Sequence, residues 1–528
     1  MPGPHRDGVD RHAPAERTRR MTAPMTGPMT GPMTGRASGA ERRAALIEKL
    51  AGLPPERRAA LLRSLGGAAA DPGGQEWPLS PGQERLWFLS RFDPGDTSYN
   101  TPWSVRLRGR LDTAALAAAF ARVTERHEVL RTRFRLRGDA PVQVVLPPAP
   151  TPVEDLVASG EAGRDGAGRD GAGPDGAGLD GAGADEALRE FAERPFDLEN
   201  EPPLRVGVAR LGEDEVVLCI VLHHIVVDGW SLDVLMRELA ECYAAAREGR
   251  EPVLAELPMQ YASFAVQERQ RDHTAGVEHW AGRLTGAPSL DLPLDHPRPS
   301  RWSGRGGREE LLLPPEEVTP LERVARKRRC TSFMALVAAY EATLALASGQ
   351  SDFCVGVPVS RRTRSELAPL IGYFGNTLVL RADLSGDPAF HELLDRVREA
   401  TLAGMRHADV PFEHILAALR VPRDVGRPPL CQAMFNLHSD LPKDDLLGTR
   451  FADLDAEVHT IPPSHTKSEV SLDLWRGPEG LGGVFDYSAD LFTPATARRL
   501  VRGFAEVVRR AGADPETRLS ALSGAFSD

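Results

Sequence analysis

Lysine is scarce in this 528-residue sequence, which contains 60 arginines but only four lysines. No Gly-Lys pair occurs, so the chain has no P-loop and does not hydrolyse nucleotides by that route. A Gly-x-Ser-x-Gly motif is also missing, which excludes the usual serine-hydrolase arrangement.

Cysteine is scarce as well, and long apolar runs are missing. The five cysteines are odd in number and show no Cys-x-x-Cys spacing, so we expect neither a disulfide framework nor a metal site. No stretch approaches the roughly 18 apolar residues of a membrane helix, and the N-terminus has no apolar signal core. We therefore expect a cytoplasmic protein that does not bind membranes.

The formal net charge of −11 argues against nucleic acid as a partner. Positive charge is nevertheless concentrated in residues 1–70, which hold 12 basic and 6 acidic side chains. The length exceeds that of one ordinary domain, so we expect two lobes with attachments.

Low-complexity segments divide the chain further. Residues 1–39 contain Met-Thr-Gly-Pro repeats and are expected to form a disordered basic tail. Residues 161–185 repeat Asp-Gly-Ala-Gly, which predicts a flexible insertion. Residues 40–75 contain two short amphipathic segments around a Gly-Leu-Pro turn. They predict a helical hairpin that is either a docking element or a cap on the first lobe.

The sequence His223-His224-Ile225-Val226-Val227-Asp228-Gly229 follows a run of apolar residues, 216–222. That run predicts a strand covered on both faces. After it, Ser231 is predicted to cap a helix that ends near Gly249. The motif is therefore expected at a strand-to-helix junction.

Successive strand side chains point to opposite faces, so we expect one of the two histidines to be buried and the other open. An imidazole that can take a proton suits acyl transfer. On spacing alone, a core histidine followed by an ordinary Asp-Gly turn is an equal alternative.

Five further segments resemble motifs of the condensation domain of nonribosomal peptide synthetases. They occur in the family's order, and the likeness runs from about Trp77 to about Arg510. The segments are Leu79–Trp87, Arg126–Phe134, Leu257–Val266, Ile371–Thr377 and His407–Glu413.

The resemblance implies an α/β fold of two chloramphenicol acetyltransferase-like sandwich lobes that form a V with a central tunnel. Residues 76–255 would form the N-terminal lobe and residues 256–528 the C-terminal lobe. A latch near residues 465–475 would cross back to the first lobe.

The resemblance also implies a reaction, in which an acceptor amine attacks a donor acyl or peptidyl thioester to form an amide. His224 would be the catalytic residue, acting as a base, by orienting the amine or by stabilising the tetrahedral intermediate. His223 and Asp228 would be structural, with Arg131 as the preferred ion-pair partner of Asp228 and Arg126 as the second choice.

Three further positions have two interpretations each. Gly229 either lets the pantetheine arm approach the backbone or is a plain turn glycine. Asn376 either lines the tunnel or makes core hydrogen bonds. Trp230 is a tunnel-lining candidate, although packing is the more common role for tryptophan.

No bound cofactor is expected, since both substrates would arrive on the phosphopantetheine of carrier proteins. The sequence has no adenylation or carrier motif, so we expect either a free-standing enzyme or one divided from a longer assembly line, which meets donor and acceptor carriers in trans. We also expect a monomer. The sequence of the motif resembles the subtype that takes L-configured donors.

The alternatives are a catalytically silent recruitment domain and an ester-forming or acyl-coenzyme A-dependent acyltransferase of the same fold. Recruitment domains usually have altered residues in the histidine motif.

Overall fold

The structure of the protein is a computed structural model. It describes residues 74–156, 181–300, 302–421, 426–438, 451–461 and 465–526. The expected tail, nearly all of the expected hairpin and residues 161–180 of the expected insertion lie outside the described residues.

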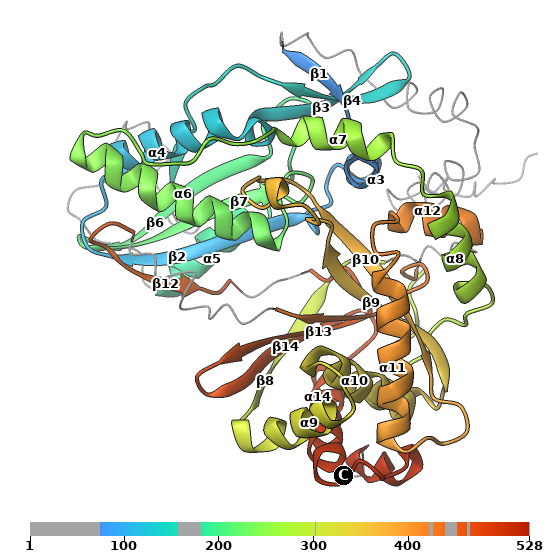
Figure 1. Ribbon diagram of the computed structural model, residues 1–528. Helices are drawn as coiled ribbons and strands as arrows, with labels where there is room; N and C mark the ends of the chain where they lie inside the picture. The colour runs from blue at the N-terminus through green and yellow to red at the C-terminus, as the bar shows by residue number, and fades with distance from the viewer. Residues whose placement is uncertain are drawn as a thin grey trace, which may run out of the picture. The chain divides into compact units, whose positions relative to one another are not determined.

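The first half of the chain is built on a five-stranded sheet (Figure 1). Its strands are antiparallel except for the parallel pair β5 and β6. The central strand β7 is buried on both faces, since every residue from Val216 to Leu222 is at most 2% exposed. This confirms the buried strand expected from the apolar run. In sheet order the strands are β12 (Asp455–His459), β2 (Asn100–Arg108), β7 (Glu215–His223), β6 (Leu204–Gly212) and β5 (Val153–Leu156).

Three helices accompany this sheet. Helices α4 (Thr113–Arg126) and α6 (Gly229–Glu248) pack on each other, and α5 (Gly181–Ala192) packs on the sheet. The expected insertion was predicted to end at 185, but residues 181–185 already belong to α5. Ala184 is 1% exposed, so the burial of apolar side chains on this helix begins within the predicted insertion.

A small three-stranded sheet completes the first half. Its strand β1 packs against α7, and its strand β4 packs against η1. Its order is β1 (Gln75–Pro78), β4 (Ala140–Val145) and β3 (Thr132–Arg137), and the accompanying helices are α3 (Pro81–Phe92), η1 (Glu128–Arg131) and α7 (Tyr261–Arg269).

The second half is built on a six-stranded mixed sheet. In strand β13, Val470, Leu472 and Leu474 are buried, whereas the alternate Ser471 and Asp473 are only partly buried. One face therefore belongs to the apolar core and the other is polar. In sheet order the strands are β10 (Gly375–Asp383), β9 (Asp352–Ser360), β11 (Ala433–Leu437), β13 (Val470–Gly477), β14 (Gly480–Ser488) and β8 (Gly306–Leu313).

The helices α9, α10, α11 and α14 pack against strands of the second sheet, and α8 packs against α12. Across the described ranges, no single helix is long and apolar enough to cross a membrane, although the bent pair α9 and α10 would pass that test together. The helices of this half are α8 (Thr274–Leu284), α9 (Pro315–Lys327), α10 (Ser332–Ser348), η2 (Ser365–Leu367), α11 (Phe390–Met405), α12 (Phe412–Leu419), α14 (Pro494–Ala513) and η3 (Leu519–Phe526).

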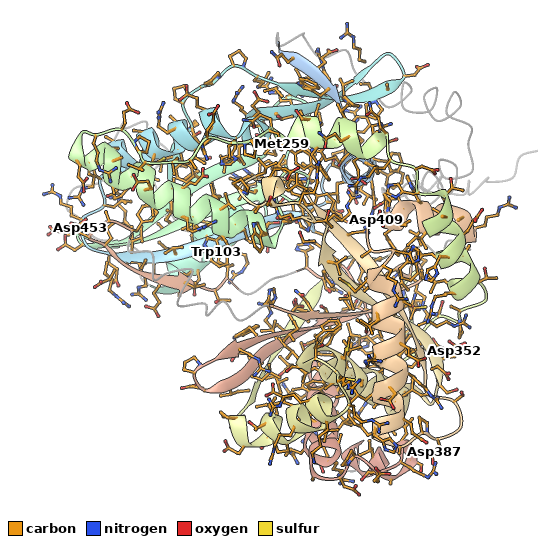
Figure 2. The ribbon with its side chains drawn as sticks, viewed as in Figure 1. Trp103, Met259, Asp352, Asp387, Asp409 and Asp453 are labelled. Carbon is orange, nitrogen blue, oxygen red and sulfur yellow. The ribbon has the colours of Figure 1, made fainter. Side chains whose placement is uncertain are left out.

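Segments of the second half contribute to the first core. Strand β12 pairs with β2, and Phe451 before it packs on Tyr243 of α6. Asp453, labelled in Figure 2, pairs with Arg247. The prediction of a crossing latch at 465–475 was therefore wrong in position. The crossing strand is β12, whereas most of 465–475 forms β13 of the second sheet, where Val470, Leu472 and Leu474 are buried.

The boundary predicted at residue 255 does not separate the two cores, because residues after it also pack into the core of the first half. Phe264 of α7 and the loop residues Ile371 and Phe374 belong to the hydrophobic core of the first half. The expected mixed α/β architecture is present, with three sheets among the described residues. The V and the tunnel stay predictions.

Candidate active site

The histidine motif begins at the end of β7, where the two imidazoles diverge. His223 is 3% exposed and lies near the rings of Tyr99 and Phe196. Its Nδ1 accepts a hydrogen bond of 3.1 Å from the backbone N–H of Ile225. Burial lowers the pKa of His223 to about 3, so the ring is neutral. The prediction that one histidine is buried is confirmed.

His224 is only half-buried and is held by three contacts. Its Nδ1–H donates to the carbonyl oxygen of Val227 at 2.6 Å, and its backbone N–H donates to the carbonyl oxygen of Tyr99 at 2.8 Å. Its ring meets that of Tyr373 edge-on, with centroids 5.1 Å apart. Because a carbonyl only accepts, the proton of the neutral ring is on Nδ1 and Nε2 presents its lone pair.

The charge state of His224 follows from the surroundings of its ring. Its pKa lies well below the usual value, first because of burial and second because of the positive charge of Lys467. The hydrogen bond to Val227 opposes this shift. His224 is therefore an unprotonated imidazole with a fixed tautomer, which is the form that accepts a proton.

Asp228 holds the start of α6 through hydrogen bonds. Its Oδ1 accepts hydrogen bonds from the backbone N–H of Ser231 at 2.9 Å and from its hydroxyl at 2.6 Å. Its Oδ2 accepts from the backbone N–H of Phe374 at 3.1 Å. The cap of α6 is thus Asp228 and not Ser231 as predicted, because the carboxylate satisfies a free N–H of the first helical turn.

The ion-pair partner of Asp228 is Arg362, at 3.0 Å. The prediction of Arg131, with Arg126 as the second choice, was wrong. The guanidinium of Arg131 donates instead to the carbonyl oxygens of Thr124 and Leu146. The guanidinium of Arg126 is paired with Glu238 at 2.9 Å.

Arg362 is a site residue that sequence reasoning missed. It follows β9, and its side chain is 4% exposed. Its guanidinium lies 3.9 Å from the centroid of the Phe374 ring and donates to the Leu367 carbonyl at 2.6 Å and to Ser231 Oγ at 2.7 Å. Arg362 thus joins the start of α6 to the loop after β9. The pair is 134 residues apart, and the only signal in the sequence was a cluster of arginines at 361–364.

The remaining candidates occupy different surroundings. Gly229 is exposed, and a Cβ added there would meet no atom within 4 Å. Trp230 is 46% exposed, and its indole N–H donates to the Ala368 carbonyl at 2.8 Å. Asn376 donates to the carbonyl oxygens of Ala408 and Val410 at 2.8 and 2.7 Å, which supports its hydrogen-bonding interpretation.

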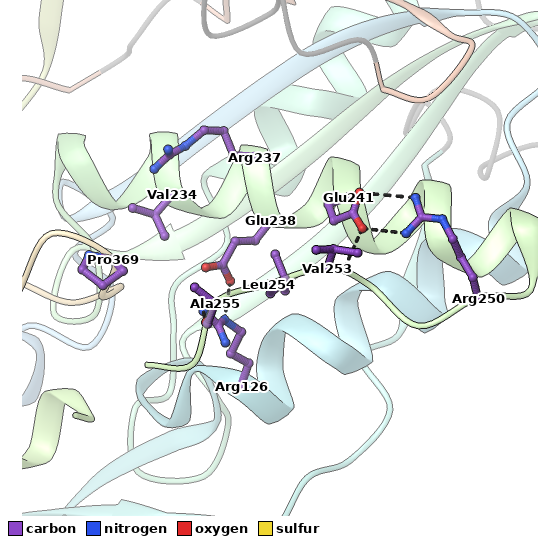
Figure 3. Close-up of a pocket in the computed structure, with 10 residues that line it drawn as sticks. All are labelled: Arg126, Val234, Arg237, Glu238, Glu241, Arg250, Val253, Leu254, Ala255 and Pro369. Carbon is purple, nitrogen blue, oxygen red and sulfur yellow. Dashed lines mark hydrogen bonds and ion pairs between the residues drawn. The ribbon is translucent and has the colours of Figure 1, made fainter. Parts of the chain in front are cut away.

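A surface cavity of about 560 Å³ lies elsewhere, between α6 and the segment that follows it (Figure 3). It is lined by residues such as Arg126, Glu238 and Arg250, and by none of residues 223–229. Within the described ranges, no group of three or more His, Cys, Asp or Glu residues is arranged to hold a metal ion.

The fold and the histidine motif define a mixed α/β protein with a half-buried imidazole at a strand-to-helix junction. Residues 74–525 match the family model of the condensation domain, and the chain belongs to that family. The resemblance found in the sequence is thereby confirmed.

Most of this chain is similar to a small part of much longer synthases. It is 38% identical to one protein of the linear gramicidin synthase of Brevibacillus parabrevis over 468 residues, which are 85% of this chain and 6% of the relative. A second protein of the same synthase is 36% identical over 84% of this chain and 8% of the relative. The chain therefore spans less than a tenth of the length of these relatives.

Among solved structures, the X-domain from teicoplanin biosynthesis is 28% identical, with a TM-score of 0.74 over 87% of this chain and 99% of that one. An X-domain from teicoplanin biosynthesis has also been solved in complex with OxyB, with 29% identity and a TM-score of 0.73 over 87% of this chain and 97% of that chain. This likeness confirms the expected α/β fold.

Proposed function

We propose that this protein condenses two thioester-bound substrates into an amide, with His224 as the group that accepts the proton of the attacking amine. The observation that supports this role most strongly is the hydrogen bond of 2.6 Å from Nδ1–H of His224 to the Val227 carbonyl. It leaves Nε2 unprotonated on a half-buried ring. Family membership supports the reaction class.

In the proposed reaction, the acceptor nitrogen attacks the carbonyl carbon of the donor thioester. A free α-amine titrates near pH 8, so much of the acceleration can come from positioning and only part from the base. Asp228 and Arg362 act on geometry, because they fix the start of α6 directly after the histidine motif.

The substrates are proposed to arrive on the phosphopantetheine of a donor and an acceptor carrier protein. Neither carrier sequence occurs within these 528 residues, so both can be added in trans in an assay. We also propose a monomer that works in the cytoplasm. The five cysteines are buried free thiols, which suits a reducing compartment.

The test uses carrier proteins loaded with L-aminoacyl groups, with dipeptidyl product detected by mass spectrometry. His224→Ala is expected to lower turnover by about 10²–10⁴-fold, as removal of an acid–base group typically does, with an unchanged melting temperature. His391→Ala, at a histidine on α11 of the second half, is the matched control. Full turnover by a folded His224→Ala protein would refute the assignment.

Recruitment of a partner enzyme is the second candidate, and the likeness to an X-domain solved with OxyB favours it. The ordered His224 tautomer favours catalysis instead, because a binding surface has no need of an unprotonated Nε2. An amide product in the carrier assay distinguishes the two.

A further inference from the structure

Lys467 lies in a turn whose other residues are firmly held. It is exposed, whereas Ser468 is 3% exposed and Glu469 is fully buried. The carboxylate of Glu469 pairs with Arg298 at 2.9 Å and with Arg427 at 3.2 Å. This turn therefore presents an exposed cation next to buried, ion-paired residues.

The ammonium of Lys467 contacts Tyr99, a residue that is hydrogen-bonded to the histidine motif. Its Nζ lies 5.2 Å from the centroid of the Tyr99 ring, within the range of a cation–π contact. The backbone carbonyl of the same tyrosine accepts the N–H of His224. The charge of Lys467 also lowers the pKa of both His223 and His224.

No hydrogen bond or ion pair of this ammonium occurs among the described residues. It is faced by Arg85 of α3, by Asp96 and by Asp473 of β13. Asp473 already accepts hydrogen bonds from Ser471 Oγ at 2.8 Å and from Asn436 Nδ2 at 3.1 Å. Arg85 is paired with Glu413 at 3.2 Å. Lys467 is therefore the uncommitted cation of this group.

Solvent reaches the Lys467 side chain, yet desolvation is the main cause that lowers its pKa to about 8. The two observations differ in the burial they imply. Both fit a side chain that keeps access to solvent while protein atoms surround much of its charged end.

The choice of lysine is itself informative in a chain with 60 arginines and four lysines. Of the other three, Lys327 is exposed in the last turn of α9, and Lys49 and Lys443 lie outside the described residues. An arginine is planar and permanently charged, whereas lysine is a compact point charge that fits beside a single oxygen.

We propose that Lys467 is a further catalytic residue, whose ammonium binds the donor carbonyl oxygen as that oxygen becomes an oxyanion opposite Nε2 of His224. This inference rests on the proposed condensation reaction. The amine nitrogen forms a bond to the carbonyl carbon, and the π electrons move to the oxygen held by Lys467. The amine proton passes to His224. When the carbonyl re-forms, the C–S bond breaks and the thiolate takes that proton from the imidazolium, which leaves an amide and a thiol.

The experiment compares Lys467→Met and Lys467→Arg with wild type in the carrier assay, using donor and acceptor carriers loaded from a panel of proteinogenic L-amino acids. Loss of one oxyanion donor typically lowers kcat by about 10²–10³-fold, so we expect that loss in Lys467→Met with little change in KM. Lys467→Arg should keep at least about a tenth of wild-type kcat, since a donor of equal charge remains. Lys327→Met is the matched control and should be unchanged.

The pH profile separates a charge from a structural role. The ratio of wild-type to Lys467→Arg rates should fall above about pH 8, where lysine loses its proton and arginine does not. Taking the ratio cancels the titration of the acceptor amine. The proposal is overturned if Lys467→Met keeps full turnover while His224→Ala does not, or if both Lys467 variants lose turnover equally. Failure of the proposed function has a different signature, in which wild type and His224→Ala are equally inactive across the panel.

Discussion

Gly229 shows at the residue scale how the site could admit a ligand. It is the first residue of α6 and directly follows Asp228, yet its φ lies outside the left-handed region. The turn therefore does not require glycine, and an added methyl group would point into open space. Close approach of a ligand is a physical reason for a glycine here, and it is the one that we propose to test.

Gly229→Ala is accordingly expected to fold with an unchanged urea midpoint and to raise KM for one loaded carrier protein about tenfold. The reason is steric, since only a bound pantetheine arm would meet the new Cβ. Urea unfolding and steady-state kinetics are the two measurements. Unchanged kinetics with both carriers would show that no ligand passes this backbone.

Glu341 is a buried acid outside the site. It lies in α10, is 2% exposed, and its Oε2 has no hydrogen-bond partner among the described residues. Burial raises its pKa to about 8. In the unfolded chain the pKa of a glutamic acid is near 4.3. Below that pH the raised pKa contributes its full stabilisation of the fold, and this contribution is lost as pH rises towards 8.

Glu341→Leu should therefore gain stability relative to wild type as pH rises from 5 to 8, by about 1.4 kcal/mol per pH unit at most. Urea unfolding at several pH values gives this difference directly. A difference that stays constant with pH would mean that the folded carboxyl ionises normally.

At the scale of elements, the Asp228–Arg362 pair joins α6 to the loop after β9. Both side chains are at most 9% exposed, so removing one charge leaves the other uncompensated. We expect Asp228→Asn to cost about 3–5 kcal/mol and the double variant with Arg362→Met to cost less than the sum of the single variants. A double-mutant cycle by urea unfolding measures the coupling. Additive costs would contradict an ion pair.

Local pattern predicted some elements and not others. The apolar run at 216–222 predicted β7, and strand alternation predicted that His223 and His224 differ in burial, because both depend on neighbouring residues alone. Arg362 and β12 depend on contacts more than 100 residues away, and local periodicity has no information about such pairing. Ser231 was predicted as a helix cap because its type allows it, but the adjacent Asp228 is better placed.

At the scale of the whole molecule, both halves of the sequence build one site. The first half supplies the histidine motif and Tyr99, whereas the second supplies Arg362, Tyr373 and Lys467. The motifs of the resemblance included the histidine motif and Tyr373, but neither Tyr99 nor Arg362. They could not predict Lys467, whose signal is only the scarcity of lysine.

The buried His223 also makes the stability of the whole fold depend on pH. His223 has a folded pKa of about 3, whereas an unfolded histidine titrates near 6.5. A depressed folded pKa stabilises above the unfolded value, and that stability is lost as pH falls, because the unfolded chain takes up a proton that the folded state refuses. For His223 alone the loss is about 2 kcal/mol between pH 7.5 and pH 5.

His223→Leu should therefore be less stable than wild type at pH 7.5, and this difference in unfolding free energy should narrow by about 2 kcal/mol at pH 5. Urea unfolding in this window avoids most carboxylate titration, and the difference between the two proteins cancels the opposing contribution of Glu341. A gap that is the same at both pH values would show that His223 accepts a proton within the fold, against its burial at the end of β7.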